Sequence, residues 1–528
     1  MTSEGSDLWK LGSEAAREGY GFFIGNTAST AILAIGSIVI ARLLGSDGYG
    51  LYSLSLVIPS FLVLFTSLGI DQSLIKYLSE YESKKLYHRI REIFKASLIF
   101  KIALGSAATA VVYFSSDLLA SIALNRPYLA PMLKLSSFLI LSQTIYTLCS
   151  NLFIGLGRAS LAGALATLQA VIKVSLIIAL LALGFGVWGA VFGHVSGYAV
   201  AAVIGLAIGF LLTRIRSRNV LDDEGSAFTL IKPLISYGLP LYASTIILVT
   251  VSQYNNLVLA NFASNIEIGS YAAAVNLSTI TLLVMTPIAT VLYPSFSKVE
   301  ATNKENLPRV FELALRYSIL LVAPTALFVS AFSRQLVNLI YGAGFHHAIS
   351  YLALYAALYS IYPFISVGVS YFNGVGLPKK TLLVNLVRLV MVLPLSPLLA
   401  YFFNVIGVIM AFTAANLAAA AYAAFFLARK EKLQFGFNRI AKIYLGSVLS
   451  AIAAYAATSF LGDLASLLAG AALFLLFYVS LIGLSRALDE RDYVNLREIL
   501  GRLRFVGRVT VAVVRYAEIL DNFIRKIL

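Results

Sequence analysis

Charged residues are scarce in this chain of 528 residues: Asp, Glu, Lys and Arg make up 12% of it, whereas hydrophobic residues make up 59%. A water-soluble protein of this length needs a far more charged surface. Apolar runs of about 20 residues recur along the whole chain, and each is long enough to cross the ~30 Å hydrocarbon core of a bilayer as a helix. The composition therefore excludes a soluble protein and predicts an all-α polytopic membrane protein.

Residue types that carry enzyme and metal chemistry are also rare. The single cysteine, Cys149, lies in an apolar run, so neither a disulfide framework nor a thiolate cluster can form. The sequence contains no P-loop motif and no H-E-x-x-H zinc motif. Its longest predicted loops, of about 20 residues, hold few carboxylates for a metal or a general base. We therefore expect no cofactor, no metal and no catalytic residue, and a protein that is not an enzyme.

Breaks between the apolar runs divide the chain into about fourteen transmembrane helices. Their predicted bounds are 20–41, 49–70, 93–114, 128–154, 161–184, 187–212, 233–262, 267–293, 310–332, 347–373, 380–403, 405–427, 440–461 and 464–484. The breaks "FGV" and "FNV" are so short that helices 5 and 6, and helices 11 and 12, should pair as helical hairpins.

The basic residues in the loops predict the orientation. If the N-terminus is inside, only three of the 40 Lys and Arg residues fall outside, namely Arg42, Arg126 and Arg334, and five fall within the spans. This asymmetry follows the positive-inside rule and places both termini in the cytoplasm, with the protein in the plasma membrane. The net charge of +15 then reflects topology and attraction to anionic lipid, not nucleic acid binding.

The chain also repeats itself at an offset of 219 residues. Five residue pairs keep this offset at corresponding points of the topology: Gly19 and Gly238, Gly50 and Gly269, Tyr52 and Tyr271, Gly155 and Gly374, and Gly157 and Gly376. Because each repeat holds six helices, both enter the membrane from the same side and form parallel repeats.

This repeat predicts five parts. They are a cytoplasmic N-terminal segment (1–19), an N-lobe of helices 1–6 (20–219), a C-lobe of helices 7–12 (220–439), accessory helices 13–14 (440–488) and a basic amphipathic cytoplasmic tail (489–528). The tail has apolar residues at helical spacing, which predicts a helix lying on the inner leaflet.

Four stretches carry a resemblance to a known family. They are "IARLLGSDGYGLYSLSLVIPSFLVLFTSLGIDQSLIKYLSEY" (40–81), "GLGRAS", "GSYAAAVNL" and "LIYGAGFHHAISYL". Over about residues 15–485 the chain resembles the polysaccharide-biosynthesis flippases, relatives of the multidrug and toxin extrusion exporters and of the lipid II flippase. The resemblance implies two six-helix lobes around a central cavity, two accessory helices and alternating-access translocation of a lipid-linked oligosaccharide.

Five cations lie within the predicted spans: Lys101, Lys134, Lys173, Arg316 and Arg388. A cation near the middle of a bilayer costs at least about 2.5–3.5 kcal/mol, so it usually faces a wet interior. Lys173 is nearest to the midplane and Arg388 is also deep, whereas Lys134 can reach the outer headgroups with its long side chain. Arg316 stands four residues after Glu312, which favours a structural ion pair. For Lys101 the structural and functional interpretations are balanced.

No carboxylate lies near the predicted midplane, which separates two kinds of transporter. An exporter of cations, or one driven by a proton or sodium gradient, normally needs such a group. An interior with fixed positive charge suits phosphate, which ammonium and guanidinium groups both bind well. We therefore predict that Lys173, Arg388 and Lys101 bind the phosphates of the substrate.

Uncharged polar residues within the spans are candidates for binding the sugar. They are Gln253, Tyr254, Asn255 and Asn256 in helix 7, Asn276 in helix 8, Asn26 in helix 1 and Gln143 in helix 4. Sugar hydroxyls need such donors and acceptors, although each of these residues could instead form a hydrogen bond between helices.

The leading hypothesis is a monomeric flippase that moves a polyprenyl-(di)phosphate-linked oligosaccharide from the cytoplasmic to the outer leaflet, for surface polysaccharide or protein glycosylation. Its partners would be this substrate, membrane lipids and a glycosyltransferase or polymerase of the same pathway. The alternatives are a cation-coupled exporter of small amphiphiles and a membrane glycan polymerase or transferase.

Overall fold

The computed structural model describes residues 3–216, 227–429, 431, 435–501 and 507–527. In these residues every element of regular secondary structure is a helix, which confirms the predicted fold class. The chain divides into two compact units, Met1–Gly269 and Ser270–Leu528. The predicted boundary between the lobes, at 219/220, lies outside the described residues.

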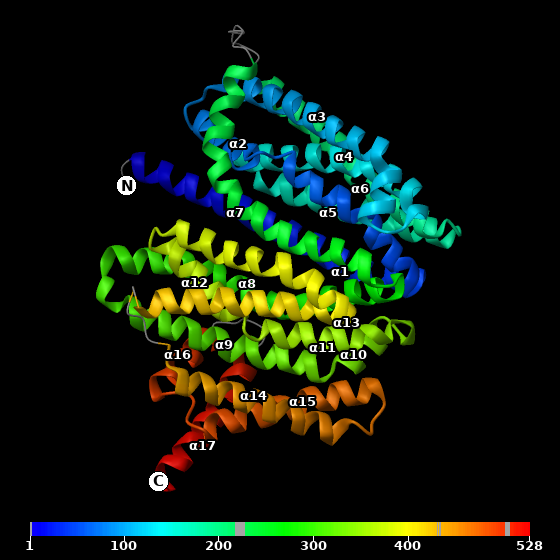
Figure 1. The fold of residues 1–528 in the computed structure, drawn as a ribbon. Coiled ribbons are helices and arrows are strands. Elements are labelled where there is room, and N and C mark those ends of the chain that lie inside the picture. Colours follow the sequence, from blue (N-terminus) through cyan, green and yellow to red (C-terminus); the bar gives the residue numbers. More distant parts are fainter. Residues whose placement is uncertain (1–2, 217–226, 430, 432–434, 502–506, 528) are drawn as a thin grey trace. The chain divides into compact units, whose positions relative to one another are not determined.

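The first unit contains the helices α1 (Ser3–Phe65), α2 (Ile70–Ser83), α3 (Tyr87–Leu118), α4 (Ala130–Gly155), α5 (Ala159–Ala182), α6 (Gly186–Arg216) and α7 (Ala227–Phe262) (Figure 1). A π-helical turn, η1 (Leu119–Ala123), and a 3-10 turn, η2 (Pro127–Leu129), join α3 to α4. Helix α5 packs between α1 and α6, and α4 packs against α3 and α6. Helix α7 contacts α1, α2 and α3.

The helix α8 (Asn265–Thr302) begins at the end of the first unit and continues into the second. The remaining helices are α9 (Leu307–Ala331), α10 (Ser333–Ile340), α11 (His346–Tyr359), α12 (Tyr362–Gly374), α13 (Pro378–Arg429), α14 (Phe437–Thr458), α15 (Asp463–Leu484), α16 (Glu490–Gly501) and α17 (Gly507–Ile527). Two 3-10 turns, η3 (Lys304–Asn306) and η4 (Ala343–Phe345), complete the second unit.

Two of these helices are too long for a single crossing of the membrane. The apolar part of α1 has 49 residues and α13 has 52, whereas a helix of 20 residues already spans about 30 Å. Each is interrupted by one residue with non-helical angles, Gly45 (φ 68°) in α1 and Asn404 (φ 50°) in α13. Glycine and asparagine tolerate positive φ better than other residues do, so the sequence places its chain reversals there.

The predicted spans fall on helices of the structure. Ten helices of the described residues are long and apolar enough to cross a membrane, or eleven if α11 and α12, bent by 41°, form one span. Two of the ten hold two predicted spans each, and α7 holds one more. Each of the fourteen predicted spans therefore falls on a helix, and the chain is a multi-pass membrane protein. The predicted hairpins appear as α5–α6 and as the two halves of α13, where a Cβ at Gly407 would collide with the Leu399 carbonyl.

The 219-residue repeat is visible in the backbone and in its packing. Gly157 and Gly376 both have positive φ, 68° and 76°, at the ends of corresponding helices. A Cβ on Gly155 would lie 2.8 Å from the Cβ of Leu78, and a Cβ on Gly374 would lie 2.7 Å from the Cβ of Phe296. Residues 78 and 296 occupy nearly the same place in their repeats. The two glycines therefore allow close packing of equivalent helices, α4 on α2 in the first repeat and α12 on α8 in the second.

The two repeats differ in the helix that follows the first chain reversal of each. Residues 46–83 are broken at 66–69, where Leu68 (φ 43°) and Gly69 (φ 83°) leave the helical region. The equivalent stretch of the second repeat is the unbroken α8, which carries Pro287 at the place that corresponds to Leu68. A proline inside a helix removes one backbone hydrogen bond and weakens that point. The same position is therefore a break in the first repeat and a proline inside an unbroken helix in the second.

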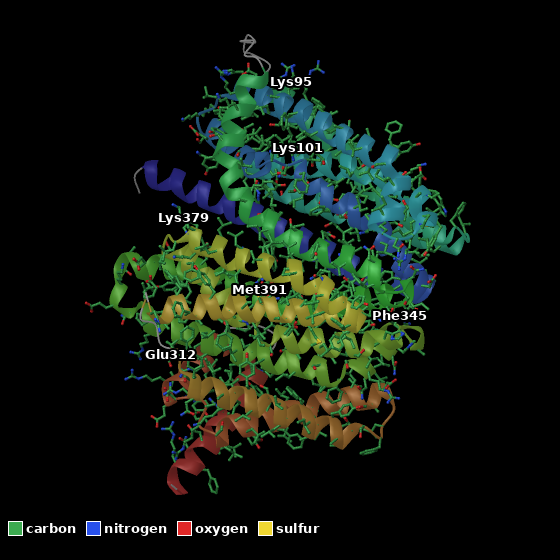
Figure 2. All side chains as sticks on the ribbon, in the orientation of Figure 1. Lys95, Lys101, Glu312, Phe345, Lys379 and Met391 are labelled. Carbon is green, nitrogen blue, oxygen red and sulfur yellow. The ribbon has the colours of Figure 1, made fainter. Side chains whose placement is uncertain are left out.

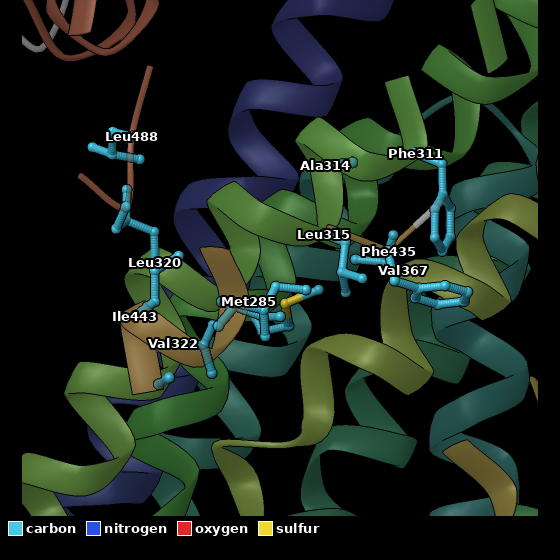
Figure 3. Close-up of a cluster of buried hydrophobic side chains, with 14 of the residues drawn as sticks. Met285, Phe311, Ala314, Leu315, Leu320, Val322, Val367, Phe435, Ile443 and Leu488 are labelled. Atoms are coloured by element: carbon cyan, nitrogen blue, oxygen red, sulfur yellow. The ribbon is translucent and has the colours of Figure 1, made fainter. Parts of the chain in front are cut away.

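The core of the second unit is apolar and aromatic (Figure 3). Phe311, Leu315 and Val322 of α9 are buried beside Val367 of α12 and Ile443 of α14. Their burial joins the accessory helices α14 and α15 to the helices of the second repeat, because α14 packs along both α9 and α15.

The tail forms two helices instead of the single predicted helix, and they pack as an antiparallel hairpin. Arg497 of α16 pairs with Glu518 of α17 at 3.2 Å, and Glu490 pairs with Arg525 at 2.8 Å. Helix α17 also contacts α15, because a Cβ on Gly483 would lie 2.5 Å from the Ala517 carbonyl oxygen. The tail therefore packs against the other helices of the second unit.

An ion pair buried in the second unit holds the start of this tail. Arg316 of α9 donates to Asp492 of α16 at 2.6 Å, and both side chains are at most 4% exposed. The Tyr317 hydroxyl donates to the same carboxylate at 2.7 Å, and Arg439 pairs with Asp489 at 2.6 Å. The ion pair of Arg316 is therefore made with the tail, not with Glu312 as its spacing in the sequence suggested.

We expect Asp492→Asn to loosen the tail, because removing one partner of a buried ion pair costs about 3–5 kcal/mol. The purified variant should unfold at a lower temperature, and its tail should be cut faster by added protease. Glu490→Gln is the matched control, since Glu490 is 73% exposed in its pair with Arg525 and such pairs contribute about 0–1 kcal/mol. Equal behaviour of the two variants would contradict the role of Asp492.

Candidate functional site

Lys173 lies in the middle of α5, on the side that faces α6. A Cβ on Gly197 of α6 would lie 2.6 Å from the Cβ of Lys173, so the glycine lets the two helices approach closely there. Among the described residues no ion pair or hydrogen bond of the Lys173 ammonium is found, and its side chain is half-buried. The midplane cation predicted from the sequence is therefore not neutralised by a carboxylate in the described residues.

Aromatic side chains gather on the same face of α6. His194, one turn before Gly197, bonds through its Nδ1 to the Tyr52 hydroxyl at 2.6 Å, and its ring stacks on Tyr198 at 5.7 Å between centroids. Tyr198 in turn meets Tyr146 of α4 at 5.3 Å, edge to face. Lys173 thus shares this face with a histidine and three tyrosines, which supply polar groups without adding negative charge.

Arg388 lies in α13 of the second unit and lines a cavity of about 180 Å³. Its side chain is 8% exposed, and its Nε has no hydrogen-bond partner in the described part of the chain. Tyr359, Tyr362, Phe412 and Asn416 line the same cavity. Met391, one turn after Arg388, marks this stretch of α13 in Figure 2. Like Lys173, Arg388 has no described carboxylate partner, but unlike the half-buried Lys173 it is buried.

The size of this cavity limits what it can hold. Small-molecule sites in proteins usually measure about 300–1,000 Å³, so about 180 Å³ suits a phosphate with a few waters but not an oligosaccharide. A guanidinium group presents several N–H donors in a plane and binds phosphate oxygens in pairs. The cavity at Arg388 therefore has the chemistry and the volume for one phosphoryl group.

Lys101 is placed differently. Its ammonium, in the first unit (Figure 2), is 1% exposed and pairs with Asp71 at 2.5 Å. Asp71 also accepts hydrogen bonds from Ser67 at 2.5 Å and from Asn151 at 2.9 Å. In this conformation the charge of Lys101 is matched within the protein, and the group ties α3 and α4 to the break between α1 and α2. The phosphate role predicted for Lys101 stays a prediction.

The predicted sugar-binding residues are spread over both units. In α7, Asn255 is buried, whereas Gln253 accepts a hydrogen bond from Asn256 at 3.2 Å and Tyr254 is half-buried. Asn26 of α1 and Asn276 of α8 have exposed side chains, and Gln143 of α4 is half-buried. The described contacts join Gln253 only to Asn256, so their common role in sugar binding stays a prediction.

The aromatic residues that contact His194 or line the cavity at Arg388 were not predicted from the sequence, but the repeat marked two interior tyrosines. Tyr52 and Tyr271 form one of the five repeat pairs. In the structure the Tyr52 hydroxyl bonds to His194, and the Tyr271 hydroxyl bonds to Tyr355 at 3.0 Å. The repeat therefore marked tyrosines that face the interior of each unit. In the described part of the chain no cluster of three His, Cys, Asp or Glu side chains could hold a metal ion.

Structural comparison identifies the fold. The lipid II flippase MurJ in an inward-closed conformation matches 90% of this chain and 99% of its own length, with a TM-score of 0.73 and 15% sequence identity. An inward-facing multidrug-resistance MATE transporter of the MOP superfamily matches 76% of this chain and 96% of its own length, with a TM-score of 0.65 and 18% identity. At these identities the likeness establishes the fold alone.

Sequence comparison identifies the family. The lipopolysaccharide biosynthesis protein WzxC of Escherichia coli is 26% identical over 340 residues, which cover 62% of this chain and 64% of WzxC. An uncharacterized membrane protein of Methanocaldococcus jannaschii is 23% identical over 356 residues, 62% of this chain and 67% of that protein. The profile of the family described as "Polysaccharide biosynthesis protein" matches residues 19–300, more than half of the chain. The chain therefore belongs to the polysaccharide biosynthesis protein family.

Proposed function

We propose that this protein is a flippase that carries a polyprenyl-phosphate- or diphosphate-linked oligosaccharide from the cytoplasmic to the outer leaflet by alternating access. The observation that carries the proposal is that two cations, Lys173 and Arg388, lie deep in the predicted membrane without a described carboxylate partner. Each cation without an anion costs free energy in a bilayer, so an anionic guest that binds there recovers part of that cost. Family membership supports a role in polysaccharide biosynthesis.

The headgroup and the sugar of the substrate would bind at different places. The cavity at Arg388 has room for phosphate, and Lys173 supplies a second positive charge on the equivalent helix of the other repeat. The sugar chain is too large for that cavity, so it must bind in a wider aqueous space, where Asn26, Asn276 and the polar residues 253–256 of α7 are our candidates. The polyprenyl chain stays in lipid, since its transfer into water is unfavourable.

Inverted membrane vesicles test this function. Labelled lipid-linked oligosaccharide is supplied on the cytoplasmic face, and its appearance on the luminal face is followed with a glycan-specific hydrolase trapped inside the vesicles. We expect translocation in vesicles that contain the protein and none in vesicles without it. Movement of cationic dyes driven by a proton or sodium gradient, without movement of the lipid-linked glycan, would instead identify a cation-coupled exporter.

A further inference from the structure

Helix α7 opens the second sequence repeat, yet all its prominent contacts lie in the first unit. It packs against α1, α2 and α3, and two sets of contacts hold it there, one where α8 begins just after the end of α7 and one in the N-terminal half of α7. Helix α7 thus belongs to the second repeat by sequence but packs on helices of the first repeat. If the two repeats move against each other during transport, the contacts of such a helix are where they would separate. Both sets of contacts lie within Met1–Gly269.

The first set is a crossing of two glycines at the predicted outer face. A Cβ on Gly50 would collide with the carbonyl oxygen of Asn265, and a Cβ on Gly269 would collide with that of Ser46. Residues 46 and 265, like 50 and 269, are separated by 219 positions. The contact is therefore reciprocal between equivalent residues, as expected where a two-fold axis passes between two copies of one structure. We call it the outer crossing.

A buried arginine reinforces the outer crossing. Arg126 is 8% exposed and donates from Nε to Asn265 at 2.6 Å. Its Nη2 donates to the Ala263 carbonyl at 2.6 Å and its Nη1 to the Ala260 carbonyl, so it caps the end of α7. Free carbonyls at the end of a helix carry partial negative charge, which a guanidinium stabilises.

The second set is another crossing of two glycines, at the predicted inner face. A Cβ on Gly69 would collide with the backbone of Gly238, and a Cβ on Gly238 with that of Gly69. Beside it Ser73 donates to the Leu234 carbonyl at 2.5 Å, and the Lys76 ammonium lies 3.8 Å from the ring centre of Tyr237. We call this the inner crossing. Gly50 and Gly69 are 19 residues apart, about 28 Å along a helix, so the crossings are separated by roughly one bilayer.

We propose that the outer and inner crossings are the two gates of the transport cycle, each opening while the other stays closed. Backbones that meet at glycines leave no gap for a lipid headgroup, so a closed crossing seals its end. The glycines themselves order no side chain, so opening a gate must chiefly break the hydrogen bonds beside it, those of Arg126 at the outer crossing and of Ser73 at the inner crossing. The inference rests on the proposed function, since gates at opposite faces serve alternating access.

Cysteine pairs beside the crossings report whether each gate is closed. The outer pair is Ala123→Cys with Asn261→Cys, where the Asn261 amide donates to the Ala123 carbonyl at 3.0 Å. The inner pair is Lys76→Cys with Tyr237→Cys. Cys149, the natural cysteine, is buried and is replaced by Ser in both backgrounds. A short bifunctional thiol reagent then cross-links a pair only when its gate is closed.

Wedges in one gate should act on the two pairs in opposite directions. Gly50→Ala, Gly50→Val and Gly50→Leu place side chains of increasing size in the outer crossing. We expect cross-linking of the outer cysteine pair to fall along this series, by about tenfold for leucine. Cross-linking of the inner pair should stay the same or rise. A tenfold change corresponds to about 1.4 kcal/mol of added repulsion. Gly238→Leu should do the reverse. The matched controls are Gly19→Leu and Gly344→Leu. A Cβ added at either glycine would have no atom of another residue within 4 Å, and Gly19 is the repeat partner of Gly238.

Two results would overturn the gates. One is a wedge that lowers cross-linking of both pairs equally in folded, monodisperse protein, because the glycines would then serve packing only. The other is a cross-linked pair that leaves translocation at its uncross-linked rate. Opposite effects of the wedges, combined with no transport of lipid-linked glycan, would keep the gates and reject the proposed substrate, because cross-linking needs no substrate.

Discussion

Arg388→Ala is expected to lower the initial rate of lipid-linked oligosaccharide translocation by about 10- to 100-fold. The range corresponds to the ~1.5–3 kcal/mol that a hydrogen bond to a charged group contributes. Lys173→Ala should have an effect of the same size. If both cations bind the same anionic headgroup, the double variant should lose less than the sum of the two single free-energy losses, because residues that act on one ligand are coupled. The inverted-vesicle assay measures all three rates.

The choice of control makes this result specific. Arg388→Lys keeps the charge but loses the paired N–H geometry, so it should retain an intermediate rate. Lys134→Ala is the matched control, because the Lys134 ammonium is 38% exposed and pairs with Asp117 at 3.0 Å. Full activity of Arg388→Ala and Lys173→Ala in correctly inserted protein would reject these residues as the phosphate site.

Lys101→Met is expected to destabilise the protein by about 3–5 kcal/mol, the usual cost of leaving one partner of a buried ion pair alone. Thermal unfolding of the purified protein measures it as a lower midpoint temperature. Asp71→Asn should have an effect of similar size, because it leaves the buried Lys101 ammonium without its anion and replaces one of the two oxygens that accept from Ser67 and Asn151 by an NH2 donor. The double variant should recover part of the loss, since it leaves no uncompensated charge.

This experiment also separates the two roles considered for Lys101. A structural ion pair predicts a loss of stability that the double variant partly repairs. A phosphate ligand predicts normal unfolding of Lys101→Met with a reduced translocation rate, which the second substitution would not restore. The second outcome would support the prediction that Lys101, like Lys173 and Arg388, binds the phosphates of the substrate.

The sequence predicted the helices of this protein well because one physical constraint dominates them. A backbone in hydrocarbon must satisfy its own hydrogen bonds, so long apolar runs become helices. Even the points where α1 and α13 reverse were marked, at the short break before residue 49 and at "FNV". The unexpected break at 66–69 occurs within an apolar run, and residues from distant segments contact the chain around it: Tyr242 donates to the Leu64 carbonyl, Ser73 donates to the Leu234 carbonyl, and Asn151 donates to Asp71.

The candidate site was predicted less completely, because charges find partners through the fold. Spacing along α9 suggested Glu312 as the partner of Arg316, yet the structure pairs it with Asp492, 176 residues later. Lys101 appeared unpaired in its span, yet Asp71 reaches it from α2. No such partner was found in the described residues for Lys173 or Arg388, and this difference could not be inferred from the distances of carboxylates along the chain.

The sequence by itself determined the membrane class, the positions of the apolar helical segments and the internal repeat, because hydropathy and glycine spacing can be read along the chain and depend on the bilayer and on helix geometry alone. Only the tertiary structure decided which buried cations are neutralised and where the two repeats touch. Both depend on side chains and backbones brought together from distant segments, as when Gly50 meets Asn265 and Gly269 meets Ser46, and contact energies fall off within a few ångströms.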